Sequence, residues 1–185
     1  MEAIQKRMRL FLAIDLPKGI KEYVFELEKK FKEAKITWVA KKNLHITLKF
    51  LGEIDKKELP KIKEQIRVKS TSLDLYLGKM GFFPNAKDPR VIWIGLEPEE
   101  KVMELQQKID EHLLSLFPGE QKFQAHLTVG RIKSIRRKED FQNSVRSIHI
   151  EPKKFQIDSY QLMKSELKKT GPVYEIIENI PLSKM

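Results

Sequence analysis

The order of secondary-structure signals in this chain repeats after 81 residues. Strand-like apolar runs begin near residues 10 and 91, and helix-like periodicities begin near 18 and 99. Further strands begin near 45 and 126 and near 73 and 154, although residue identity between the halves is slight. We therefore predict one bilobal domain over residues 1–185, with repeat halves at approximately 8–82 and 90–165 and a C-terminal strand at 172–182.

Each half has the order strand, helix, strand, helix, strand, with the first helix predicted from Ile20 to Ala34 by apolar residues three and four positions apart. Amphipathic helices bury one face of a sheet and leave its other face free. We therefore predict an α+β fold of two pseudo-symmetric lobes, each an antiparallel sheet backed by helices. The two free faces would form a cleft, which is where we expect the active site.

Composition narrows the classes of function. The 36 Lys and Arg outnumber the 26 Asp and Glu and leave a formal charge of +10, which favours a polyanionic partner. The absence of Cys excludes a thiolate nucleophile and a Cys-type zinc site. The longest apolar run, residues 10–14, is far below the roughly 20 residues that span a bilayer. We expect a cytoplasmic monomer that does not bind membranes.

The same short motif occurs at equivalent positions of the two halves. It is His-Ile-Thr-Leu at residues 45–48 and His-Leu-Thr-Val at residues 126–129. Because side chains at positions i and i+2 of a strand share a face, His45 and Thr47 point together to one side, and His126 and Thr128 do the same. The apolar residues between them would enter the core, so all four polar side chains face the cleft.

Two imidazoles and two hydroxyls in one cleft are suited to phosphodiester chemistry. With an unperturbed pKa near 6.5, one His can act as general base while the other, protonated beside an anionic substrate, acts as general acid. The Thr hydroxyls can donate hydrogen bonds to phosphate oxygens. A hydroxyl is a poor zinc ligand, so we predict catalysis without a metal or another cofactor.

Nearly the whole chain resembles the 2H phosphoesterases, and within them the RNA 2′,3′-cyclic phosphodiesterases, also called 2′-5′ RNA ligases. The resemblance is carried by Arg9–Pro17, His45–Glu53, Arg90–Leu96, His126–Arg131, and Ser165 with Gly171, Pro172 and Tyr174. It implies an enzyme that opens the terminal 2′,3′-cyclic phosphate of an RNA, such as a tRNA, to a 2′-phosphate. It also implies a related reverse reaction that joins RNA ends by a 2′-5′ bond.

The resemblance further implies a role for each motif residue. His126 is the proton acceptor that activates water, and His45 is the proton donor to the departing 3′ oxygen. Thr47 and Thr128 hold the phosphate. Sequence symmetry alone leaves the two histidines interchangeable.

Two substrate-binding residues also come from the resemblance: Phe50 as a platform for the terminal base and Arg131 as a phosphate contact. Both lie five positions after their motif His, and strict alternation puts that position on the opposite face. Each strand must therefore bulge, twist or end first; Gly130 permits this beside Arg131, whereas nothing equivalent precedes Phe50. Lys49 shares the parity of His45 and could add charge to the cleft, or it could be a solvated edge lysine.

Two alternatives remain open from the sequence. The protein could be a non-catalytic basic module that binds single-stranded RNA, in which case Trp38 and Trp93 could stack on bases rather than pack at the strand positions we assign to them. It could also be a cyclic phosphodiesterase that acts on small nucleotides. A bell-shaped pH dependence would exclude the module, and turnover on a nucleoside cyclic phosphate against an RNA end would separate the two enzymes.

Overall fold

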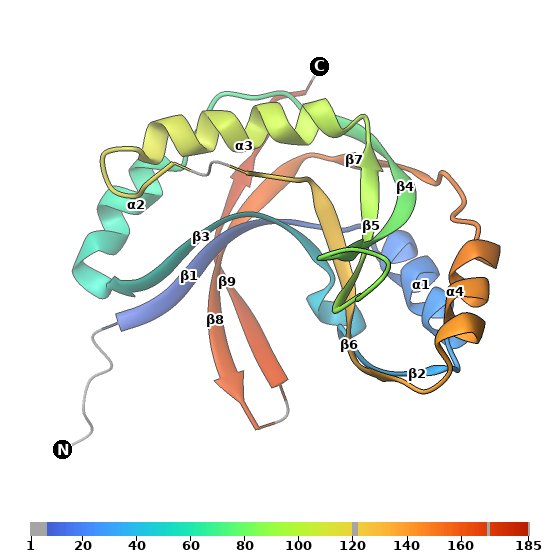
Figure 1. Ribbon diagram of the computed structural model, residues 1–185. Helices are drawn as coiled ribbons and strands as arrows, with labels where there is room; N and C mark the ends of the chain where they lie inside the picture. The colour runs from blue at the N-terminus through green and yellow to red at the C-terminus, as the bar shows by residue number, and fades with distance from the viewer. Residues whose placement is uncertain (1–6, 120–121, 170, 185) are drawn as a thin grey trace.

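A computed structural model describes residues 7–119, 122–169 and 171–184 (Figure 1). The strands are β1 (Arg7–Asp15), β2 (Ala34–Trp38), β3 (His45–Asp55), β4 (Leu73–Phe83), β5 (Val91–Glu97), β6 (His126–Ile135), β7 (Lys154–Ile157), β8 (Ser159–Lys168) and β9 (Gly171–Pro181). The α-helices are α1 (Lys18–Leu27), α2 (Leu59–Gln65), α3 (Glu99–Leu113) and α4 (Lys138–Ser147), and the 3₁₀ turns are η1 (Glu28–Lys30), η2 (Lys41–Asn43) and η3 (Lys56–Glu58).

In the described part of the chain, the strands form one curled antiparallel sheet in the order β7-β4-β5-β6-β3-β1-β8-β9, with β2 paired to β6. The two lobes meet where β3 and β6 pair through Ile46 and Leu127. The predicted α+β, two-lobed architecture is confirmed, and the segment expected as a C-terminal edge strand is β9, which pairs with β8.

The lobes do not coincide with the halves of the sequence. Strand β4 leaves the first half and pairs with β5 and β7, whereas β8 leaves the second half and pairs with β1. Helices α1 and α3 follow the same exchange. Lys49 of β3 forms an ion pair with Asp110 of α3, and the backbone N–H of Glu151, before β7, donates to Tyr23 of α1. The expectation that each half builds its own lobe is therefore wrong.

The core lies between the outer face of the sheet and the helices. Alternate residues of β1 are fully buried, among them Leu10, Leu12 and Ile14. Helix α3 buries residues at three- and four-residue spacing, with Leu105 and Ile109 completely enclosed. Each such side chain contributes about 1.5–3 kcal/mol on burial, so the helices hold the curvature of the sheet and leave its inner face available.

The first helix is shorter than its apolar spacing predicts. It ends at Leu27, and Ala34, expected as its last apolar contact, begins β2 instead. Phe31 still faces the core, where its ring lies 5.5 Å from Trp38 and 6.0 Å from Phe141 of α4. Phe31 is buried four residues after Leu27, as the next turn of a helix would be, although the helix has ended. None of the helices in the described residues is long and apolar enough to span a membrane.

Candidate active site

The two His-x-Thr motifs lie side by side at the centre of the sheet. The antiparallel pairing of Ile46 with Leu127 places His45 across from Thr128 and Thr47 across from His126. Residues directly opposite in such a pair lie about 4.5–5.5 Å apart, and diagonal neighbours such as the two histidines lie about 7–8 Å apart. Because Ile46 and Leu127 are completely buried, the four polar side chains share the inner face.

Both imidazoles contact a backbone carbonyl through Nδ1, and Nε2 of His45 also lies 3.1 Å from Oγ1 of Thr47. Nδ1 of His45 lies 2.7 Å from the carbonyl oxygen of Asn43, and Nδ1 of His126 lies 2.8 Å from that of Gln124. A carbonyl only accepts hydrogen bonds, so each Nδ1 carries a proton and each Nε2 is the atom that gains or loses one. Sequence reasoning missed these supports because they are backbone atoms two residues before each His.

Matching β-bulges follow the two motifs. Relative to β1, strand β3 has an extra residue at Leu48, and relative to β5, strand β6 has an extra residue at Val129. Each bulge reverses the alternation and returns Phe50 and Arg131 to the inner face, where both line the same pocket. The bulge required before Arg131 is present, and an equivalent one precedes Phe50 without the help of a glycine.

The same bulge turns Lys49 away from the cleft. Its side chain is buried, and its ammonium group forms an ion pair with Asp110 and donates to the carbonyl oxygen of Pro118 at 2.8 Å. Both interpretations of Lys49 from the sequence, a cleft cation and a solvated edge lysine, are therefore wrong. The residue joins β3 to the segment around the end of α3.

A pocket of about 770 Å³ opens beside His45, and we call it the His45 pocket. Among the residues that line it are His45, Thr128, Phe50, Arg131, Tyr174 and Trp38, whereas Thr47 and His126 lie outside its lining. The volume is in the range of small-molecule sites. Phe50 is 72% exposed and therefore has little packing role. Trp38 packs on Phe31, as expected, but it also faces the pocket.

The surroundings of the two histidines differ. Rings of Phe11 and Tyr174 each lie 5.2 Å from the ring of His45, and burial raises the pKa of the Tyr174 hydroxyl. His126 instead contacts Phe83, with ring centroids 5.0 Å apart. The sequence symmetry of the motifs is thus broken by neighbours that come from different strands.

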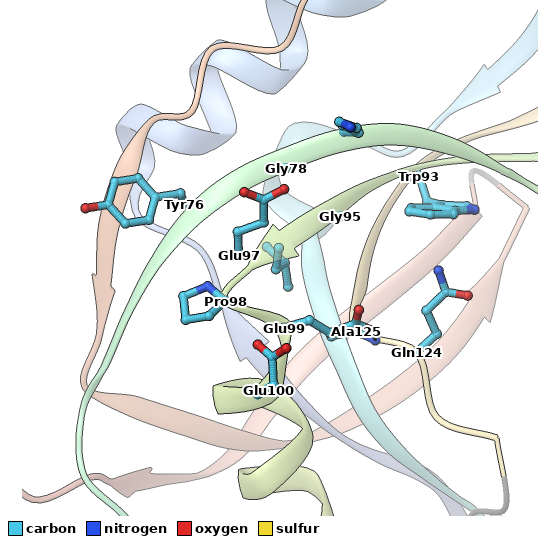
Figure 2. Close-up of a pocket in the computed structure, with 12 residues that line it drawn as sticks. Tyr76, Gly78, Trp93, Gly95, Glu97, Pro98, Glu99, Glu100, Gln124 and Ala125 are labelled. Atoms are coloured by element: carbon cyan, nitrogen blue, oxygen red, sulfur yellow. Dashed lines mark hydrogen bonds between the residues drawn. The ribbon is translucent and has the colours of Figure 1, made fainter.

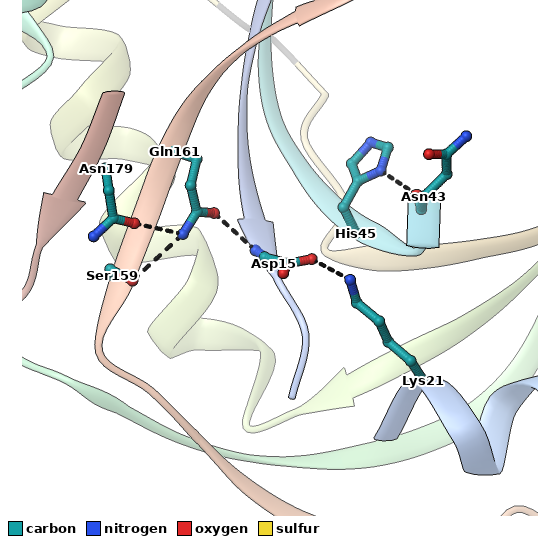
Figure 3. A network of polar contacts seen from close by, with 7 residues as sticks. All are labelled: Asp15, Lys21, Asn43, His45, Ser159, Gln161 and Asn179. Atoms are coloured by element: carbon teal, nitrogen blue, oxygen red, sulfur yellow. Dashed lines mark hydrogen bonds and ion pairs between the residues drawn. The ribbon is translucent and has the colours of Figure 1, made fainter. Parts of the chain in front are cut away.

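A polar network lies behind His45 (Figure 3). Asp15, whose backbone pairs with His45 across β1 and β3, forms a 2.5 Å ion pair with Lys21 of α1. The side chain of Gln161 accepts from the backbone N–H of Asp15 at 3.0 Å and donates to Asn179 at 2.8 Å. This network fixes a carboxylate and an ammonium group near the imidazole.

Groups around His45 shift its pKa in both directions. Burial is the largest cause and lowers the pKa of His45 below its usual range; the Asn43 carbonyl and the Asp15 carboxylate oppose this, whereas Lys21 and His126 add to it. The ring of His45 is therefore largely neutral at neutral pH until an anion binds beside it.

Substitutions in this network should move the pKa of His45 in opposite directions. In Asp15→Asn the imidazolium loses a stabilising charge and the pKa falls further, whereas in Lys21→Met a repelling charge is removed and the pKa rises. An NMR titration of the His45 ring resonances measures both. Shifts of the same sign in the two variants would contradict this assignment of the charges.

Each half of the chain matches the same protein family. The model of the family described as "LigT like Phosphoesterase" matches the chain twice, over residues 14–93 and 94–174. The chain belongs to this family. LigT-like relatives named RNA 2′,3′-cyclic phosphodiesterase include one from Methanocaldococcus jannaschii, 39% identical over 92% of this chain and 99% of the relative. Another, from Thermotoga maritima, is 32% identical over 92% of this chain and 93% of the relative.

Solved structures of other proteins share the fold. A protein of Thermus thermophilus superposes with a TM-score of 0.78 at 27% identity and covers 96% of this chain and 99% of its own. LigT of E. coli, complexed with phosphate, superposes with a TM-score of 0.74 at 24% identity over 96% of this chain and 99% of its own. The two-lobed sheet is therefore the architecture of the family.

Proposed function

We propose that this LigT-like enzyme opens the terminal 2′,3′-cyclic phosphate of RNA to a 2′-phosphate, without a metal ion. The observation that carries the proposal is the single antiparallel pairing that aligns both His-x-Thr motifs on one face. The names of its relatives support an RNA substrate, and so does the charge of +10. A non-catalytic RNA-binding module would not need two imidazoles with matched protonation at Nδ1.

The reaction requires one proton acceptor and one proton donor on opposite sides of phosphorus. Nε2 of His126 removes a proton from water, whose oxygen forms the new bond to phosphorus. The bond from phosphorus to the 3′ oxygen breaks, and the proton on Nε2 of His45 passes to that oxygen. Thr47 and Thr128 donate hydrogen bonds to the non-bridging oxygens, where charge accumulates in the transition state.

The different surroundings of the histidines support this division of roles. The departing 3′ oxygen belongs to the nucleoside, and a nucleoside needs a pocket with an aromatic or apolar wall. His45 lines such a pocket together with Phe50 and Tyr174, whereas His126 lies outside it. The acid is thus next to the leaving oxygen, and the base is on the side from which water approaches.

The depressed pKa of His45 is compatible with an acid role. A cyclic phosphate carries a negative charge, and an anion beside the ring stabilises the imidazolium. The carboxylate of Asp15 also raises the pKa of His45. Arg131, which lines the pocket, can bind the negatively charged phosphate of the substrate. Binding of the substrate therefore favours the protonated imidazolium form of His45, which is the proton donor.

Ligation of RNA ends uses the same groups. A 5′-hydroxyl takes the place of water at His126, so the product is a 2′-5′ phosphodiester and the 3′ oxygen again receives the proton of His45. We propose this ligase activity as a second property of the site, because nothing in the arrangement of the four motif residues distinguishes the oxygen of water from that of an alcohol.

The position of the product phosphate tests the proposal. The enzyme, incubated with an oligoribonucleotide that ends in a 2′,3′-cyclic phosphate, should give the 2′-phosphate in ³¹P NMR spectra, and EDTA should leave the rate unchanged. The same measurement on a nucleoside 2′,3′-cyclic phosphate separates an RNA enzyme from one for small nucleotides. A 3′-phosphate product, or loss of activity with chelator, would overturn the assignment.

A further inference from the structure

A second pocket, of about 570 Å³, is lined largely by residues of β4 and β5 (Figure 2), and β5 lies on the side of β6 opposite to β3. We call it the Tyr76 pocket. Tyr76, Gly78, Trp93, Gly95, Glu97 and Gln124 are among the residues that line it. Gly95 pairs with His126 and Trp93 pairs with Thr128 across β5 and β6, so the pocket opens on the same face of the sheet as the catalytic motif. Its described lining shares no residue with the His45 pocket.

The Tyr76 pocket is continuous with the environment of His126. The ring of Trp93 lies 6.3 Å from the ring of His126. Gln124, which lines the pocket, also supplies the carbonyl oxygen that holds Nδ1 of His126. A group seated in this pocket is therefore on the side of phosphorus opposite to the nucleoside in the His45 pocket.

We propose that the Tyr76 pocket binds a second nucleoside, the one whose 5′ oxygen bonds to phosphorus in ligation and leaves it in cleavage of a 2′-5′ bond. This inference rests on the proposed function, which places the entering oxygen at His126 and the departing 3′ oxygen at His45. The two nucleosides of a 2′-5′ linkage would then occupy one pocket each, with the phosphate between the motifs.

The step balances without any further reactant. In ligation the 5′-hydroxyl proton goes to Nε2 of His126, the bond from phosphorus to the 5′ oxygen forms, and the bond to the 3′ oxygen breaks. The 3′ oxygen takes the proton of His45. In cleavage the 3′-hydroxyl attacks, His45 accepts its proton, and His126 protonates the departing 5′ oxygen.

The walls of the Tyr76 pocket match a nucleoside in shape. Tyr76 and Trp93 stand at opposite sides with Glu97 between them (Figure 2). Bases stack on aromatic side chains in a sequence-tolerant way. Gly78 and Gly95 present bare backbone, and a glycine within a strand often marks a place where a ligand approaches closely. A volume of 570 Å³ is within the range of small-ligand sites.

The charge of the Tyr76 pocket selects a neutral group. Among its described lining residues, the three carboxylates of Glu97, Glu99 and Glu100 outnumber the one ammonium group, that of Lys79, so the pocket is negative on balance. Glu99 also accepts from the backbone N–H of Ala125 at 3.1 Å. Carboxylates accept hydrogen bonds from base amino groups and ribose hydroxyls but repel phosphate. The occupant is therefore the terminal nucleoside with a free 5′-hydroxyl.

The test compares one reaction that needs the second nucleoside with one that does not. We expect Tyr76→Ala to lower kcat/KM for cleavage of a 2′-5′-linked dinucleoside monophosphate by about 10-fold, the scale of one lost stacking contact. Hydrolysis of a nucleoside 2′,3′-cyclic phosphate should stay within about 3-fold of wild type, because only water enters at His126. Tyr76→Phe, which keeps the ring, should behave as wild type in both assays.

A second variant fills the pocket. A Cβ at Gly95 would meet its nearest neighbours at 3.5 Å and 3.6 Å, so Gly95→Ala fits, whereas the longer side chain of Gly95→Leu projects into the pocket. Gly95→Leu should lose dinucleotide cleavage, and Gly95→Ala should retain most of it, with thermal melts confirming that both fold. Equal losses on both substrates in Tyr76→Ala, or no cleavage of the 2′-5′ bond by wild type, would overturn the inference. A wild-type protein that fails to hydrolyse the cyclic phosphate would instead overturn the proposed function.

Discussion

Replacing His126 or His45 by Ala is expected to lower kcat/KM for opening of an RNA 2′,3′-cyclic phosphate on the order of 1000-fold, the scale of a lost general acid or base. His126→Ala lacks the proposed proton acceptor, and His45→Ala lacks the proposed proton donor. The fold should be retained, because both rings stand on the inner face and the residues that hold the sheet, such as Ile46 and Leu127, are unchanged. Initial rates and thermal melts of each variant measure the two effects.

His112→Ala is the matched control for these variants. It removes an exposed imidazole from α3 and should leave the rate unchanged. An aryl phosphodiester then separates the acid from the base, because a phenolate departs without a proton. With that substrate His45→Ala should regain much of the lost rate and His126→Ala should not. Near-normal turnover by either alanine variant on the cyclic phosphate would contradict the two-histidine mechanism.

The sequence predicted which polar side chains share a face better than it predicted the topology. The repeated motif sits in strands, and period-two alternation determines which side chains share a face, so His45, Thr47, His126 and Thr128 could be placed together before any coordinates. Alternation does not determine which strand is the neighbour. The exchange of β4 and β8 between lobes depends on contacts far apart in the chain, and no local pattern carries that information.

The bulges mark the limit of reasoning from alternation. At Val129 the following Gly130 signalled a bulge, but at Leu48 no residue did, and one unmarked extra residue moved Phe50 into the cleft and Lys49 out of it. One extra residue in a strand moves each of the side chains after it to the opposite face from the one that alternation predicts. The symmetry of the repeat was the available signal, because a bulge required in one copy could have been expected in the other.

The buried ion pair that results from this reversal should be a large determinant of stability. Lys49 and Asp110 have side chains only 3% and 13% exposed. Asp110→Asn leaves the ammonium group of Lys49 buried without its counter-charge, which costs about 3–5 kcal/mol in comparable buried pairs. We expect a loss of that size in the free energy of unfolding, measured by urea denaturation, with kcat/KM at a temperature where the variant is folded within about 3-fold of wild type.

Apolar replacement of both partners distinguishes a structural lysine from a substrate-binding one. Because hydrophobic residues of similar volume can replace a buried ion pair at little cost, the double variant Lys49→Met with Asp110→Leu should recover most of the stability that Asp110→Asn loses. If Lys49 instead bound RNA, Lys49→Met would lower kcat/KM strongly and leave the unfolding midpoint in place. The packing of Lys49 against Asp110 and Pro118, on the face of β3 opposite to His45, predicts the reverse: the midpoint moves and catalysis does not.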